Sequence, residues 1–170
     1  MWRRRTVLLA LGASLGACNF RPLYLAEGPA DAAVQDELAA IEIRGLGGRL
    51  GYLVRTALLD ELNPASAEVP PRYVLDVDLR ARSQELGIQL DNTITRYNLL
   101  LTAAFRLQAK DRPDVLYASR VQRVASYNVS REPYADLSAA REAERRAAQE
   151  VARGIRTLLA VHLARTPVIT

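Results

Sequence analysis

The stretch YVLDVDLRAR, residues 73–82, alternates apolar and polar side chains almost without interruption. In an extended chain, successive side chains point to opposite faces of a sheet. One face of this stretch is therefore apolar and consists of Tyr73, Leu75, Val77, Leu79 and Ala81. The other face carries Val74, Asp76, Asp78, Arg80 and Arg82. The pattern predicts a β-strand from Arg72 onward, with one face covered by other elements and one face in water.

Two runs further along the chain share this period of two. The run from Asn98 to Lys110 has an apolar face made of Leu99, Leu101, Ala103, Phe105 and Leu107. Residues 110–114, KDRPD, contain the Asp and Pro residues typical of a turn. The run from Val115 to Val129 loses its phase near Gln122 and Arg123, which indicates a bulge or a strand end at that point. Together the three runs predict an antiparallel meander.

A short strand and a helix are expected before this meander. In residues 39–44, Ile41 and Ile43 alternate with charged neighbours, which indicates a strand. The glycines of GLGG, residues 45–48, interrupt it. Apolar residues then recur at helical spacing, namely Leu50, Leu53, Val54, Ala57, Leu58 and Leu62. This helix should end near Asn63, because Pro64 follows.

The C-terminal part of the chain predicts one long amphipathic helix. From about Asp136 to Ala164 the sequence is rich in Ala, Arg and Glu. Its less polar positions recur at spacings of three, four and seven, namely Leu137, Ala140, Ala147, Val151, Ile155, Leu158 and His162. At 1.5 Å per residue the helix is about 40 Å long. Gly154 is a candidate position for a bend.

The order of these elements predicts an α+β fold. We expect a two-layer sandwich in which two helices pack on one face of a mostly antiparallel four-stranded sheet. The sequence shows no internal repeat, and residues 32–170 should form a single domain. A domain of this length is large enough to bury a hydrophobic core.

The first 17 residues have the pattern of a signal peptide. Arg3, Arg4 and Arg5 precede an uncharged stretch, residues 6–17, of Leu, Val, Ala, Gly and Ser with one Thr. This stretch is far shorter than the roughly 20 residues that span a bilayer, so a transmembrane helix is the weaker interpretation. The arginines also match the twin-arginine export pattern weakly, and the choice between the two export routes stays open.

Leu15, Gly16, Ala17 and Cys18 resemble a lipobox, the signal that a bacterial signal peptidase recognises before a cysteine that receives diacylglycerol. The alternative is an ordinary buried cysteine, since free cysteine is among the most buried residue types. The order of basic, apolar and small residues before Cys18 favours lipidation. Residues 18–31, rich in Gly, Pro and Ala, are then expected to form a lipidated tether.

Removal of the signal peptide changes the charge of the protein. Without Arg3, Arg4 and Arg5, 20 Lys and Arg residues stand against 19 Asp and Glu residues. This balance does not favour a nucleic-acid partner. Cys18 is the only cysteine, so an internal disulfide and a thiolate metal cluster are excluded. We expect no metal and no cofactor.

The residues that could carry catalysis are few. His162 is the only histidine, and no nucleophile motif such as G-x-S-x-G accompanies it, so we interpret it as a packed or surface histidine. Asp76 and Asp78 lie on the polar face of a strand beside arginines, which favours a solvated face with cross-strand ion pairs. GLGGRLG, residues 45–51, lacks the spacing of a phosphate loop and favours a turn that leads into a helix. These features do not indicate an enzyme.

The heptapeptide CNFRPLY, residues 18–24, resembles the mature N-terminus of the LPS-assembly lipoprotein family, LptE, in its alphaproteobacterial form. That form usually begins Cys-Gly-Phe-Arg-Pro-Leu-Tyr, so Asn19 is a departure. The order of elements is also similar over the whole chain. Asn19 is not the acidic residue associated with retention in the inner membrane, and the resemblance therefore implies the outer membrane.

The resemblance implies a role without catalysis. Members of the family plug the lumen of the outer-membrane β-barrel LptD, assist its assembly and contact lipopolysaccharide. A polar exterior of mixed charge is compatible with a wet lumen. The alternative is an auxiliary lipoprotein of a periplasmic lipid-transport ABC system, and a lipoprotein enzyme is a third, weaker interpretation.

Two groups of residues are candidates for contacts in such a role. The tether residues Phe20, Leu23 and Tyr24 could dock on the barrel or on the lipoprotein's own core, and Arg21 before Pro22 makes the link between them stiff and extended. Lys110, Arg112, Arg120 and Arg123 could meet the phosphates of lipopolysaccharide, because Arg binds phosphate in a bidentate manner. A solvated turn is the alternative for the second group, because Asp111 and Asp114 dilute its charge.

Overall fold

The computed structural model describes residues 29–64, 66–88, 94–112, 114–129 and 132–165. The described residues form seven elements in chain order: α2 (Pro29–Ala39), β1 (Ile41–Arg44), α3 (Gly48–Leu62), β2 (Tyr73–Ile88), β3 (Ile94–Ala109), β4 (Val115–Asn128) and α4 (Pro133–Arg165). The predicted signal peptide, residues 1–17 with Leu15, Gly16 and Ala17, lies outside the described residues. So do Cys18 and the tether residues Phe20, Arg21, Pro22, Leu23 and Tyr24.

The strands form one four-stranded sheet in the order β1-β2-β3-β4. β1 pairs with β2 in parallel, and α3 connects the two. β2, β3 and β4 form the predicted antiparallel meander, with Leu75 opposite Leu107 and Ala103 opposite Val121. The predicted α+β fold with a mostly antiparallel sheet is confirmed.

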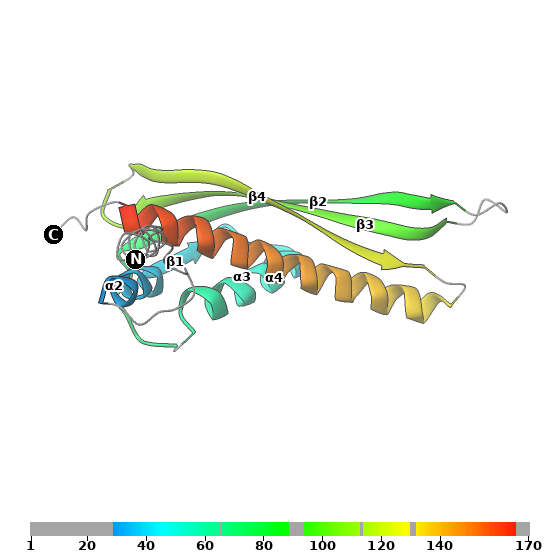
Figure 1. Ribbon diagram of the computed structural model, residues 1–170, viewed down its shortest axis with the longest axis horizontal. Coiled ribbons are helices and arrows are strands. Elements are labelled where there is room, and N and C mark those ends of the chain that lie inside the picture. The colour runs from blue at the N-terminus through cyan, green and yellow to red at the C-terminus, as the bar shows by residue number, and fades with distance from the viewer. Residues whose placement is uncertain (1–28, 65, 89–93, 113, 130–131, 166–170) are drawn as a thin grey trace, which may run out of the picture.

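The helices cover one face of the sheet (Figure 1). α4 runs diagonally across the sheet and packs mainly on β4, while α3 and α2 pack against α4. The core joins the apolar side chains of α3 and α4 to the apolar face of the meander. Its largest fully buried members are Phe105, Leu38, Leu58, Leu75, Leu101, Leu107, Ile155, Leu159, Val54, Val77 and Val151.

α2 is a third helix that the sequence did not predict. It begins at Pro29, so residues 29–31 of the predicted tether belong to it. Proline is well tolerated in the first turn of a helix, since the backbone N–H that it lacks has no partner there. Within α2 the larger apolar residues are Val34 and Leu38, one turn apart, which is too few to establish a helical period. Leu38 is nevertheless completely buried.

The irregularity of β4 lies elsewhere than predicted. Pairing continues without a break where Gln122 and Arg123 lie opposite Thr102 and Leu101. The register shifts instead near the start of β4, because Tyr117 and Val115 lie opposite consecutive residues of β3 and Leu116 is the extra residue. The apparent loss of phase arose because a charged side chain, that of Arg123, occupies a position on the helix-facing side of β4.

The predicted covered face of β2 is covered over only part of its length. Leu75 and Val77 are buried, but Ala81 is exposed. The reason is the path of α4, which packs mainly on β4 and β3 and not on β2. The helix layer is therefore narrower than the sheet at Ala81.

The glycines after β1 form the predicted turn into α3. Gly45 has a φ of +80°, and a Cβ at this position would meet the Asp76 side chain and would lie 3.0 Å from the carbonyl oxygen of Val77. Only glycine adopts such a conformation at low cost. α3 ends as predicted at Asn63, whose backbone N–H donates to the carbonyl oxygen of Leu59 at 3.0 Å.

Candidate functional site

The face of the sheet opposite the helices is open and polar. Side chains on this face form rows across the three long strands, because residues opposite one another in a sheet share a face. The central rows are Asp78, Ala104 and Arg120, then Arg80, Thr102 and Gln122, then Arg82, Leu100 and Val124. The small side chains of Ala104 and Thr102 leave the middle of the first two rows low.

The three arginines of these rows surround a shallow depression. Arg80 and Arg82 come from β2 and Arg120 from β4, and all three are exposed. The depression has a volume of about 340 Å³ and is lined by Asp78, Arg80, Arg82, Leu100, Thr102, Ala104, Arg120 and Gln122. We call this depression the open-face arginine site. Its only acidic member is Asp78.

Other charged side chains on the same face neutralise one another. Arg106 Nη2 lies 3.3 Å from Asp76 Oδ2, a cross-strand ion pair of the kind expected on this face. Glu42 of β1 pairs with Arg44 at 2.9 Å and with Lys110 at 3.6 Å. Within the described part of the chain, by contrast, Arg80, Arg82 and Arg120 form no ion pair. Unpaired positive charge therefore gathers at the open-face arginine site.

The ion pairs of Glu42 at the β1 edge shift the pKa values of the paired groups. A hydrogen bond from Arg44 lowers the pKa of the Glu42 carboxyl below its ordinary value, and the charge of Lys110 acts in the same direction. The same hydrogen bond raises the pKa of the Arg44 guanidinium. Both effects stabilise the charged forms. Lys110 therefore has a carboxylate beside it.

The four basic residues predicted to meet lipopolysaccharide do not gather at one place. Lys110 pairs with Glu42, and Arg112 is an exposed residue of the β3–β4 turn. Arg120 belongs to the open-face arginine site. Arg123 lies on the other face of β4, where its guanidinium is next to Gly154 of α4. Only Arg120 joins the cluster that the tertiary structure forms.

Arg80 and Arg82 are the members of this site that the sequence analysis missed. The alternation of residues 73–82 places both on the solvated face of β2, which is where they lie. The alternation of polar and apolar residues in β2 shows which face Arg80 and Arg82 occupy. It does not show that Arg120 of β4 lies on the same face near them. The position of Arg120 two strands away depends on the register of both antiparallel pairs.

A groove separates the free edge of β4 from α4. It has a volume of about 490 Å³ and is lined by Arg120, Val121, Gln122, Arg123, Glu150, Arg153, Gly154, Thr157 and Leu158. The missing side chain of Gly154 leaves room for both strand neighbours: a Cβ there would lie 2.8 Å from Val121 Cγ1 and 3.0 Å from Arg123 Nη2. We call it the β4 edge groove.

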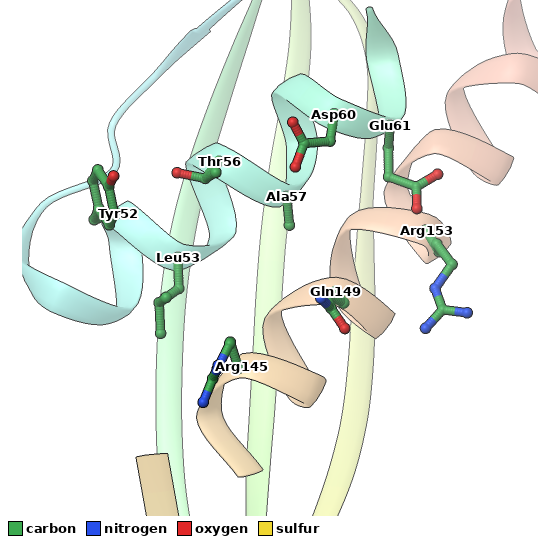
Figure 2. A pocket seen from close by; sticks show the side chains of 9 residues that line it. All are labelled: Tyr52, Leu53, Thr56, Ala57, Asp60, Glu61, Arg145, Gln149 and Arg153. Atoms are coloured by element: carbon green, nitrogen blue, oxygen red, sulfur yellow. The ribbon is translucent and has the colours of Figure 1, made fainter. Parts of the chain in front are cut away.

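A second groove lies between α3 and α4 (Figure 2). Its volume is about 470 Å³, and Tyr52, Leu53, Thr56, Ala57, Asp60 and Glu61 of α3 face Arg145, Gln149 and Arg153 of α4. Both arginines are already engaged, because Arg145 pairs with Glu142 at 2.6 Å and Arg153 with Glu150 at 2.8 Å. This groove therefore offers an anion little uncompensated charge.

The remaining candidates for chemistry have structural roles. The ring of His162 stacks on that of Tyr117, with 4.5 Å between the ring centroids and an interplanar angle of 12°, so of the packed and surface positions expected for it the histidine takes the packed one. Asp76 is paired with Arg106. In the part of the chain that the structure describes, no group of three or more His, Cys, Asp or Glu side chains could hold a metal ion. Nor does any helix in that part have the length and apolar character needed to cross a membrane.

Solved structures with this fold come from several bacteria. A candidate lipoprotein from Caulobacter crescentus CB15 is 28% identical, covers 79% of this chain and 98% of its own, and superposes with a TM-score of 0.67. A minor lipoprotein from Acinetobacter baumannii is 17% identical over 71% of this chain and 88% of its own, with a TM-score of 0.56. Rare lipoprotein B from Shewanella oneidensis is 16% identical over 71% of this chain and 92% of its own, with a TM-score of 0.50. No curated protein shows significant sequence similarity to the chain.

The fold and its neighbours define a class of small α+β sandwich found among bacterial lipoproteins. Within this class, the lipopolysaccharide-assembly family LptE matches residues 31–159, and the chain belongs to that family. The match spans every described element except the start of α2 and the end of α4. Membership makes the chain a lipopolysaccharide-assembly lipoprotein, connected with the outer membrane and with the machinery of lipopolysaccharide transport, in a family that is not enzymatic.

Proposed function

We propose that this protein is anchored in the outer membrane by a lipid on Cys18, occupies the lumen of the β-barrel LptD as a plug, and assists assembly of that barrel. We propose further that it contacts lipopolysaccharide through the open-face arginine site. The observation that carries the second part is the group of three unpaired arginines on the sheet face opposite α2, α3 and α4, which none of the described helices covers.

The surface of the sandwich supports the plug role. Its apolar side chains are concentrated between the sheet and the helices, and its open sheet face consists mainly of charged and small polar residues. The lumen of an outer-membrane barrel is polar, whereas its lipid-facing wall is apolar. A protein with this surface is suited to the lumen and not to the lipid.

The composition of the open-face arginine site supports the lipopolysaccharide contact. Arginine has a planar fork of donors that matches the oxygens of a phosphate. In the row of Arg82, the neighbours across the sheet are Leu100 and Val124, and Val124 is 54% exposed. Phosphate-binding and apolar groups are thus side by side, which fits an amphiphile that carries phosphate groups.

Purification from outer membranes tests the plug role. The tagged full-length protein should recover LptD in a near-equimolar amount, and photo-crosslinkers at exposed positions within residues 76–82 should attach to the lumen side of that barrel. Recovery of the lipoprotein alone, or with an inner-membrane permease and no barrel, would contradict the proposal. The second of these outcomes would favour the ABC-system alternative.

Replacement of the arginines tests the lipopolysaccharide contact. The variant Arg80→Gln/Arg82→Gln/Arg120→Gln should bind lipopolysaccharide at least tenfold more weakly than the parent. It loses three unpaired guanidinium groups, each of which carries a positive charge and donates hydrogen bonds to phosphate. The matched control is Arg141→Gln/Arg145→Gln/Arg165→Gln, which removes the same charge from exposed positions of α4. Equal loss in both variants would indicate attraction by net charge alone and would contradict a site on the sheet.

A further inference from the structure

β4 is a long strand, and among the described residues no other strand pairs with its outer edge. It is the last strand in the order β1-β2-β3-β4 and comprises 14 residues, whereas the opposite edge strand β1 has only 4. The outer edge of a strand presents a row of unpaired N–H and C=O groups that can accept another strand. Most natural edges are short, bulged or covered. From Tyr117 to Asn128, pairing of β4 with β3 continues without a bulge.

Arginine side chains occupy part of this edge in place of a strand. Arg123 Nη1 donates to the carbonyl oxygen of Gln122 at 2.8 Å, and Arg146 Nη2 of α4 donates to the carbonyl oxygen of Ser126 at 3.0 Å. In an antiparallel pair, residues two apart direct their backbone groups to the same side. Val124, which lies between these two residues, therefore directs its N–H and C=O groups outward as well.

The surroundings of the edge are basic. The β4 edge groove contains Arg120, Arg123 and Arg153, and Arg146 lies further along the strand. The acidic residue of the groove, Glu150, is engaged by Arg153 at 2.8 Å. Within the described residues, Arg120 and Arg123 have no carboxylate partner. A strand that docks here would meet a row of guanidinium groups.

We propose that the outer edge of β4 binds an extended acidic segment of a partner protein, which adds to the sheet as a fifth strand. On docking, Arg123 and Arg146 release the carbonyl oxygens of Gln122 and Ser126, which then accept backbone N–H groups of the segment. The two guanidinium groups pair with carboxylates of the segment. Hydrogen bonds of guanidinium to carboxylate are stronger than those to a neutral carbonyl, so the exchange is favourable. The inference does not depend on the role proposed for the open-face arginine site.

The charge of the edge also selects among occupants. A second copy of this chain, paired edge to edge through β4, would bring two arginine-rich edges together, each with Arg120, Arg123 and Arg146. Like charges opposite one another across strands are destabilising. An acidic strand has the opposite effect, and its backbone supplies the donors and acceptors that the edge lacks.

A defined peptide tests this site on the full-length, detergent-solubilised protein. The probe is a fluorescent ten-residue peptide of alternating Glu and Val, and its binding is measured by fluorescence anisotropy. Val124→Pro removes one outward N–H without touching the ladder to β3, since proline is compatible with an edge position. We expect at least tenfold weaker binding for Val124→Pro and unchanged binding for the control Val124→Thr, which keeps the N–H. Arg123→Gln/Arg146→Gln should also weaken binding at least tenfold.

A modified probe keeps the test independent of the folding of these variants. The same peptide with N-methyl groups on alternate residues keeps its charge. It lacks the backbone N–H groups that would donate to the carbonyl oxygens of β4, so it cannot add to the sheet as a strand. Loss of binding on methylation supports strand addition. Equal binding of the methylated peptide, or displacement of the peptide by inorganic phosphate at millimolar concentration, would show a simple anion site and overturn the proposal. Absence of binding by the parent peptide would overturn it as well.

Discussion

Gly154 of α4 lies directly against Val121 of β4, so close that a Cβ on the glycine would stand 2.8 Å from Val121 Cγ1. Val121 is 4% exposed, and its branched side chain has little freedom to move. The contact explains a glycine inside a 33-residue helix, where its low helix propensity costs about 1 kcal/mol relative to alanine. The sequence suggested a bend at this position, and the structure shows a close approach of helix to strand.

Gly154→Ala should therefore destabilise the protein. Overpacking costs about 1–3 kcal/mol and outweighs the gain in helix propensity. The control is the same change in a Val121→Ala background, where the space is open and Gly154→Ala should stabilise by up to about 1 kcal/mol. Urea unfolding of the four variants measures both effects. The same sign in both backgrounds would contradict the packing explanation.

Gly47→Asp should stabilise the start of α3. Gly47 occupies the N-cap position with extended backbone angles, makes no side-chain cap, and has open space around its missing Cβ. The first turn of α3 also lacks an acidic residue. A carboxylate there caps a free N–H and interacts with the helix dipole, for a gain of about 0.5–1 kcal/mol in the free energy of unfolding. Gly47→Ala is the control, and a variant no more stable than this control would refute the prediction.

Tyr73 should make the protein sensitive to alkaline pH. Burial, and then the neighbouring carboxylate of Glu37, raise the pKa of the Tyr73 hydroxyl above its ordinary value. A raised pKa means that the folded state favours the protonated hydroxyl. The contribution of Tyr73 to the free energy of unfolding is therefore complete below about pH 10 and declines as pH rises through the folded pKa. Tyr73→Phe should remove this decline from denaturant unfolding measured between about pH 9 and pH 11.

The control for this measurement is Tyr52→Phe, because Tyr52 is 67% exposed. Its unfolding free energy should follow the parent through the same pH range. If the parent and Tyr73→Phe lost stability in parallel above about pH 10, other groups would be responsible for the alkaline sensitivity.

Cys18→Ser should abolish lipidation and membrane attachment. Transfer of the lipid requires the nucleophilic thiolate, which serine lacks. Each acyl methylene buried in the membrane contributes roughly 0.8 kcal/mol, so the variant should move to the soluble fraction. Metabolic labelling with a fatty acid, followed by fractionation, measures both. Label that persists on Cys18→Ser would contradict the lipobox.

Local periodicity was enough to predict most elements. The alternation of residues 73–82 identified β2, the spacing of apolar residues identified α3 and α4, and the glycines after Arg44 identified a turn. These patterns are reliable because the direction of each side chain depends only on the conformation of its own segment. α2 was not predicted because Val34 and Leu38 are too few to define a helical period. The helix packs on α4, a contact between distant segments that the local sequence does not reveal.

The sequence by itself determined the two faces of β2 and β3, the order of the elements after α2, and a resemblance to the LptE family that residues 31–159 confirm. Only the tertiary structure decided that Arg80, Arg82 and Arg120 share one depression while Arg123 turns toward Gly154. It also decided that Ala81 stays exposed on a face predicted to be covered. The reason is that strand register and the path of a helix across a sheet are fixed by packing between segments some 40 residues apart, which no local period records.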